Sequence, residues 1–252
     1  MIGYALSSAV AAAPITAEIA EALLCNLRRL EAWWTTPNPV WNNLANVSLV
    51  WSAEVGAIPS DPELAVVQVV ESLPDAPQDV AYHTTDSAGR PMCLISWAAV
   101  QAEGGTVSGP NGLVAAISHE ILESRADPLC VLSVPLPGAN TTGDLSTPLE
   151  VCDWVQGSDY EEPGSPGIFV ANAVGPRFFM QGATGLLDIR SDVTTGAVTS
   201  AFQETPGGYH EVITGSGVVS QVFGDLVPAA TRARIQRTGT RGGQRAAQAR
   251  PR

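Results

Sequence analysis

The chain has 252 residues, of which 45% are hydrophobic and 15% are charged. This composition is typical of a folded chain with a sizeable core and excludes an intrinsically disordered protein. The formal net charge is −12 and is unevenly distributed. Residues 232–252 carry seven arginines and no acid, whereas residues 1–231 carry six arginines and 25 acidic residues, a formal charge of −19.

Neither a membrane segment nor a secretory signal is expected. No apolar run reaches the 18 or so residues that a membrane span needs. Residues 1–14 are small and apolar, but they lack the basic start of a signal peptide. The four cysteines show no C-x-x-C spacing. Cys130 and Cys152 flank one loop. They could form a disulfide, or both could be reduced cysteines in the core.

The first half of the chain alternates predicted helices and strands. Residues 16–34 predict a helix, because apolar side chains recur at a helical period behind the potential N-cap Thr16. Apolar runs predict strands at residues 45–55, 64–70, 80–83 and 93–100. The second half is rich in turn residues, with short strands expected at 168–170 and 177–180 and a hairpin at 208–224. These elements indicate an α+β fold with a small mixed sheet and a loop-rich C-terminal half that ends in a β-hairpin.

The most informative segment is residues 110–128, which begins and ends with proline. A proline is tolerated in a first helical turn, and the residue before a proline is pushed out of the α region, so one helix should fill this segment. His119 and Glu123 are four residues apart and therefore project from the same face. Glu120 lies about 60° around the helix from Glu123. All three side chains can face one cavity.

This spacing is typical of a zincin helix. In H-E-x-x-H two residues at i and i+4 hold a metal ion, and the glutamate between them acts as general base on water that the ion activates. Here Glu123 replaces the second histidine, and a carboxylate ligand brings Mn²⁺ or Fe²⁺ into consideration beside Zn²⁺. The alternative is a solvated helix face, but the apolar remainder of the helix and a later acidic group, Glu150 and Asp153, favour a metal site.

Three carboxylates compete for the third ligand position. Glu150 is the first choice, because gluzincin-type sites take a glutamate from a later segment, and Asp153 fits the outer acid that follows it. These two roles are exchangeable. Asp127 is the rival, since it lies about 80° around the helix from the histidine of the motif, although an aspartate that ends the helix is an equal alternative. His83 and Tyr160 are the candidates for stabilising an oxyanion, and His83 also fits a structural role at a strand end.

The order of several short motifs resembles a family of uncharacterised phage and prophage proteins. These motifs are Tyr82-His83, Gly89-Arg90-Pro91, S-H-E-I-L-E at 118–123 with Asp127-Pro128, Glu150-Val151-Cys152-Asp153, Asn172, Pro176-Arg177-Phe178-Phe179 and Gly207-Gly208-Tyr209. The central segment of the family is zincin-like, with S-H-E-x-x-E-x-x-x-D-P followed by E-x-C-D. The resemblance implies a zincin-like, metallopeptidase-type domain over residues 16–224. An N-terminal extension (1–15) and a basic disordered tail (225–252) would flank it.

Two classes of function follow from this reading. The first is a zinc-dependent metallopeptidase that acts on a peptide or protein substrate. The alternative is a non-catalytic phage structural or interaction protein that retains the zincin frame and contacts other proteins of the phage particle. The host cytoplasm or the virion is the expected location. The seven arginines from Arg232 to Arg252 predict weak contact with nucleic acid or another polyanion, unless they form only a solvated end.

Overall fold

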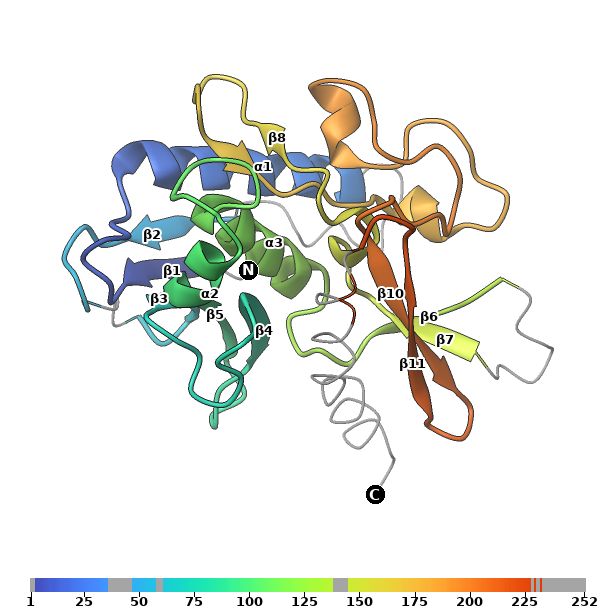
Figure 1. Cartoon of the computed structure of the whole chain (residues 1–252), viewed down its shortest axis with the longest axis horizontal. Helices are drawn as coiled ribbons and strands as arrows, with labels where there is room; N and C mark the ends of the chain where they lie inside the picture. Colours follow the sequence, from blue (N-terminus) through green and yellow to red (C-terminus); the bar gives the residue numbers. More distant parts are fainter. Residues whose placement is uncertain are drawn as a thin grey trace.

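The computed structural model describes residues 3–35, 47–57, 61–137 and 145–227, together with Ala229 and Arg232. It has a mixed α+β architecture, with a five-stranded sheet and the long helices in the first half of the chain (Figure 1). The second half is loop-rich and carries a four-stranded sheet and a two-stranded sheet. Within the described residues no helix combines the length and apolar character that crossing a membrane requires.

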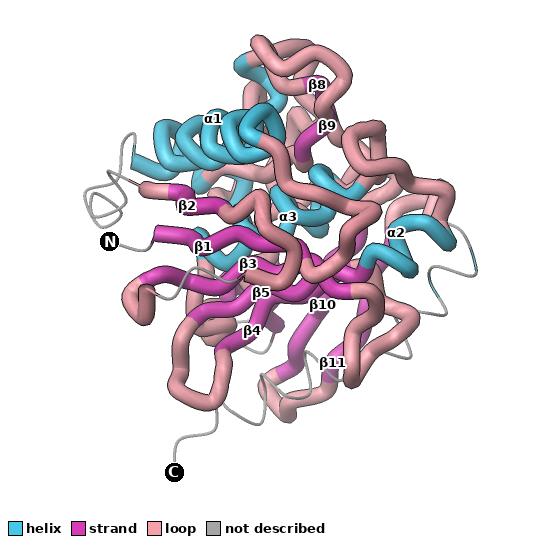
Figure 2. Tube along the Cα trace, turned by 90° about the vertical axis from the view of Figure 1, so that its left-hand side faces the viewer, coloured by secondary structure: helices cyan, strands magenta, loops and turns pink. Residues whose placement is uncertain are grey.

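The five-stranded sheet is mixed, with the order β2-β1-β3-β5-β4. Its strands are β1 (Gly3–Ser8), β2 (Leu49–Trp51), β3 (Leu64–Val70), β4 (Ala81–Thr85) and β5 (Pro91–Ser96). Neighbouring strands run parallel except β4, which pairs antiparallel with β5 at one edge. Figure 2 shows these five strands side by side in one layer. The register places His83 of β4 opposite Cys93 of β5.

Several local predictions differ from the structure. Of the strand expected at 45–55, only Leu49–Trp51 forms a strand among the described residues. The segment expected as an N-terminal extension contains β1, whose six residues are all buried between β2 and β3. The strand expected at 93–100 ends at Ser96, because the Ser96 side chain accepts a hydrogen bond from the Ala99 amide and caps α2 (Trp97–Ala102). Residues 177–180 were expected as a strand, but Pro176–Phe179 form a 3-10 turn, for which proline in the first turn is suited.

The two long helices form where the periodicity predicts them. The first, α1, spans Ala17–Thr35, and the motif helix, α3, spans Leu113–Ala126. All residues of α3 except Ala116 and His119 are buried, because the helix packs against α1, β4, β5 and β9 (Phe169–Val170). A helix enclosed on so many sides carries a polar side chain only where that side chain has a partner.

The second half of the chain contacts α3 through β9 and forms two sheets. Its larger sheet has the order β11-β10-β7-β6. The strands are β6 (Ser133–Pro135), β7 (Leu145–Pro148), β10 (Tyr209–Thr214) and β11 (Val219–Phe223), and the smaller sheet pairs β8 (Tyr160–Glu161) with β9 (Phe169–Val170). The pairing of β10 with β11 confirms the predicted hairpin. The 3-10 turn Asp153–Val155 contacts β10 and lies at the end of the predicted acidic segment.

Candidate metal centre

The first cluster of metal-ligating atoms joins α3 to the 3-10 turn. The His119 Nε2 atom lies 3.3 Å from Glu123 Oε2 and 3.2 Å from Asp153 Oδ1. In a tetrahedral zinc site with bonds of 2.0–2.1 Å, neighbouring ligand atoms are about 3.3–3.4 Å apart. Both distances from His119 Nε2 match this separation, and the three ligand atoms lie within 4.8 Å of one another, as a divalent ion requires.

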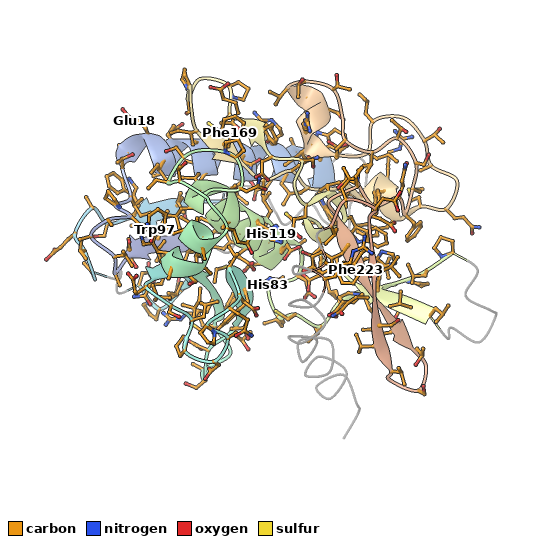
Figure 3. The ribbon with its side chains drawn as sticks, in the orientation of Figure 1. Glu18, His83, Trp97, His119, Phe169 and Phe223 are labelled. Atoms are coloured by element: carbon orange, nitrogen blue, oxygen red, sulfur yellow. The ribbon has the colours of Figure 1, made fainter. Side chains whose placement is uncertain are left out.

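A second cluster lies beside the first and shares Glu123 with it. His83 projects from β4 towards α3, and Figure 3 shows it near His119 in the middle of the molecule. Its Nδ1 atom is 3.3 Å from Glu120 Oε2 and 3.5 Å from Glu123 Oε2. Its Nε2 atom is 3.7 Å from Glu150 Oε2. One nitrogen of His83 and one oxygen from each of Glu123 and Glu150 lie within 4.8 Å of one another.

Cys152 explains how residues 150–153 reach the helix. Its backbone amide donates to Glu123 Oε1 at 3.2 Å, and its thiol donates to the His119 carbonyl at 3.6 Å. These two bonds hold the segment against one turn of α3. Glu150 and Asp153, on either side of Cys152, are thereby directed to different histidines. The sequence left their roles exchangeable, and the structure pairs Asp153 rather than Glu150 with His119.

The cluster concentrates more negative than positive charge in a buried place. Burial lowers the pKa of His119, but the charge of Glu123 and the hydrogen bond with Asp153 raise it well above its usual range. Burial likewise opposes ionisation of Glu123, yet the two histidines hold the pKa of this carboxyl well below its usual range. Burial, together with the charge of Glu123, raises the pKa of Asp153 to about 6. A divalent cation would relieve this competition between carboxylates.

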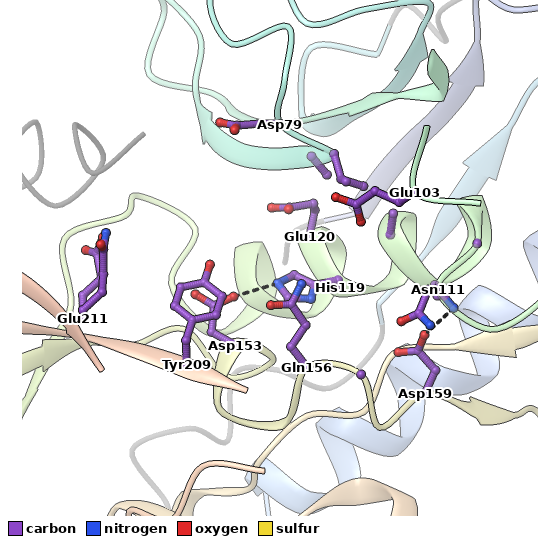
Figure 4. Close-up of a pocket in the computed structure, with 17 residues that line it drawn as sticks. Asp79, Glu103, Asn111, His119, Glu120, Asp153, Gln156, Asp159, Tyr209 and Glu211 are labelled. Carbon is purple, nitrogen blue, oxygen red and sulfur yellow. Dashed lines mark hydrogen bonds and ion pairs between the residues drawn. The ribbon is translucent and has the colours of Figure 1, made fainter. Parts of the chain in front are cut away.

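A pocket opens over the first cluster, between β4, the start of α3 and the β10–β11 hairpin. Its acidic lining residues are Asp79, Glu103, Glu120, Asp153, Asp159 and Glu211. Figure 4 shows Asp153 and Tyr209 on one side of His119, with Glu120, the next residue of α3, above it. Among the described residues that line this pocket there is no arginine. The pocket therefore favours cations and positively charged ligands.

Two of the predicted site residues lie elsewhere. Asp127 ends α3, and its two carboxylate oxygens accept from the backbone amides of Val131 and Leu132 at 3.1 and 2.8 Å. These contacts are those of an aspartate that ends the helix, the alternative role considered for Asp127, and not those of a third ligand. Tyr160 is buried in β8, where its hydroxyl donates to Asn26 at 2.7 Å and accepts from Arg29 at 2.8 Å. It does not line the pocket, so an oxyanion there is out of its reach.

The tyrosine that does line the pocket is Tyr209, which sequence reasoning did not assign to the site. Its hydrogen bond with Asp153 lowers the pKa of that carboxyl, against the larger effect of burial. In the sequence, the glycine pair before Tyr209 is the feature that could have indicated its place in the site. A Cβ at Gly207 would lie 2.9 Å from the Gln156 carbonyl, and one at Gly208 would overlap the Trp154 carbonyl. The glycines therefore let β10 approach the turn that carries Asp153.

The remaining sequence predictions concern thiols and the tail. All four cysteines are free, so Cys130 and Cys152 form no disulfide. Burial raises the pKa of the Cys152 thiol well above its usual range. Of the predicted tail, 225–252, the structure describes residues 225–227, Ala229 and Arg232, whose guanidinium donates to the carbonyls of Val227 and Gly224. The other six arginines lie outside the described residues. Binding of the tail to nucleic acid or another polyanion stays a prediction.

Comparisons with models of protein families, with curated proteins and with solved structures find no match for this chain.

Proposed function

We propose that this protein is a metal-dependent hydrolase, a zincin-like metallopeptidase of phage origin that cleaves peptide bonds. One observation carries the proposal: His119 Nε2 lies 3.2–3.3 Å from carboxylate oxygens of Glu123 and Asp153, beside a pocket that Glu120 also lines. The mixed sheet beside the motif helix is compatible with a zincin-like frame. Zn²⁺ is the proposed ion, with Mn²⁺ and Fe²⁺ as the alternatives that a carboxylate-rich ligand set allows.

An ion held by His119, Glu123 and Asp153 would act as a Lewis acid and would lower the pKa of water in the pocket. Glu120 is the general base, because it lines the pocket and directly follows the ligand His119 in α3. It takes a proton from the attacking water as the new C–O bond forms. It then delivers that proton to the amine nitrogen as the C–N bond breaks. His83 Nδ1, 3.3 Å from Glu120 Oε2, positions this carboxylate during both transfers.

The ligand set also affects the strength of the site. One imidazole and two carboxylates place more negative charge on the ion than two imidazoles and one carboxylate do. The ion is then a weaker Lewis acid than in a site with two histidines. Substrate binding is helped by the acidic lining of the pocket, which attracts peptides that carry basic side chains.

The test has two steps. Metal analysis of the purified protein should find a transition-metal ion. A peptidase assay should then show kcat of Glu120→Gln lower by about 10²–10⁴-fold, the usual contribution of a general base, with the metal content unchanged. Glu18→Gln, an exposed position in α1, is the matched control and should keep full activity. If metal is present and wild type and Glu120→Gln are equally inert, the non-catalytic phage structural protein is the better description.

A further inference from the structure

Only one ring nitrogen of His83 has a role in the proposed hydrolase mechanism. The residue is 5% exposed and faces three carboxylates. Its Nδ1 atom is hydrogen-bonded to Glu120. Its Nε2 atom is buried, lies 3.7 Å from Glu150 Oε2, and forms no hydrogen bond with any residue that the structure describes. A buried imidazole nitrogen left in this way is costly unless another group binds it.

The tautomer that suits Nδ1 determines what Nε2 can bind. In the neutral tautomer that keeps its proton on Nδ1 for Glu120, Nε2 presents a lone pair towards Glu150, and this is the tautomer that a cation at Nε2 would select. The Nε2 lone pair and the Glu150 carboxylate are then two acceptors that repel each other. A cation between them would be coordinated by both and would remove this repulsion. A ring N–H held by a carboxylate is the arrangement that metal-ligating histidines usually show at the nitrogen that does not bind the metal.

We propose that His83, Glu150 and Glu123 form a second cation site, so that Glu123 bridges two divalent ions in a dinuclear centre. The inference rests on the proposed function in one respect, since the first ion is the one held by His119, Glu123 and Asp153. Glu123 Oε2 lies 3.3 Å from His119 Nε2 and 3.5 Å from His83 Nδ1 and is therefore situated between the two imidazoles. Each cluster is compact enough to hold its own ion.

The charge of the cluster agrees with two ions. Four buried carboxylates, those of Glu120, Glu123, Glu150 and Asp153, surround two imidazoles. In two-metal hydrolytic sites the ions lie about 3.5–4 Å apart and share ligands of this kind. The second ion would be the more enclosed one, because the side chain of His83 is 2% exposed and that of His119 is 17% exposed. The ligands of the first ion include His119 and Asp153, which line the pocket, whereas His83 and Glu150 of the second site do not line it.

Metal stoichiometry separates this inference from the proposed function. The wild-type chain, stripped with a chelator, reloaded with Mn²⁺ and desalted, should retain two ions. His83→Gln and His119→Gln should each retain one. The matched control is His210→Gln, because His210 is the third histidine, stacks on Trp154 and belongs to neither cluster. It should retain two ions.

Other outcomes are equally informative. One ion in wild type that is lost with His119→Gln and kept with His83→Gln overturns the second site and leaves the proposed function standing. Two ions in His83→Gln also overturn it. No ion in wild type removes both proposals together.

Because His83 is buried, its replacement can disturb folding. Spectroscopy of the wild-type protein tests the second site without a variant. Electron paramagnetic resonance of the Mn²⁺-loaded chain should show an exchange-coupled pair with about half the hyperfine spacing of an isolated ion, as expected for ions that share a ligand at the separation of two-metal sites. An isolated-ion pattern at full loading would overturn the bridging role of Glu123.

Discussion

Single carboxylates in this protein are distinguished by the partners of their oxygens. Glu123 and Asp153 each direct an oxygen at His119 Nε2, within 3.3 Å. Asp127 is as deeply buried, at 2% exposed, but both its oxygens accept from backbone amides. A carboxylate saturated by N–H donors has little capacity left for a cation. The helical wheel could not separate these cases, because it shows direction and not hydrogen-bond partners.

The contacts of Asp127 lead to a stability prediction. Asp127→Ala removes two charge-assisted hydrogen bonds and should lower the free energy of unfolding by about 1.5–3 kcal/mol, as measured by urea denaturation. Metal content should be unchanged, because the residue belongs to neither cluster. Asp153→Ala is the comparison and should lose the ion that His119 shares. If Asp127→Ala loses metal but keeps its stability, Asp127 is a ligand after all.

The predictability of the site follows from how local its geometry is. His119, Glu120 and Glu123 lie on one helix, so their spacing was sufficient to predict that they share a cavity. Asp153 comes from 30 or more residues later and could only be nominated by its acidic neighbourhood. The position of His83 depends on the antiparallel pairing of β4 with β5, which places it under α3. The residues around His83 alone do not predict that β4 pairs with β5, so its position could not be derived from the sequence.

The same distinction holds for whole elements. Both long helices and the β10–β11 hairpin were predictable, because their signals are periodicity, caps and turn residues. The strand β1 was missed, since a run of small apolar residues becomes a strand only through its parallel partners β2 and β3. The end of β5 was missed as well. Trp97 continues the apolar run, but the Ser96 cap turns the chain into α2.

Close approach of β10 to the Asp153–Val155 turn is the element-level contact on which the pocket depends. Gly208→Ala places a Cβ against the Trp154 carbonyl, which already accepts from the Thr205 amide and has little room to move. The variant should lose about 1–3 kcal/mol of stability through overpacking, and Tyr209 should be displaced from Asp153. Urea denaturation measures the first effect. The second should appear as a lower kcat in the peptidase assay.

A substitution in the same hairpin serves as the control. Ser220→Ala lies at an exposed position of β11 and should change the unfolding free energy by no more than about 0.5 kcal/mol. If Gly208→Ala is as stable and as active as Ser220→Ala, the hairpin does not depend on close backbone approach.

For the molecule as a whole, the buried acidic cluster couples folding to cation binding. Residues 1–231 carry a formal charge of −19, and several of these carboxylates are gathered around α3. Gathering them costs electrostatic free energy in the folded state that the extended chain does not incur. An ion bound only by the folded state offsets this cost, so stability should depend on the concentration of free divalent cations.

Chelation provides the measurement. With free ion at 100 times its dissociation constant, binding of one ion adds about 2.7 kcal/mol to stability, so each ion removed should lower Tm by roughly 5–11 °C at about 2–4 °C per kcal/mol for a domain of this size. Excess divalent ion should restore it. His119→Gln should show a smaller chelator shift, because the ion shared by Glu123 and Asp153 loses its imidazole ligand. His210→Gln should respond as wild type does. An unchanged Tm on chelation would mean that the buried carboxylates are accommodated without a cation, by the protons and imidazoles alone.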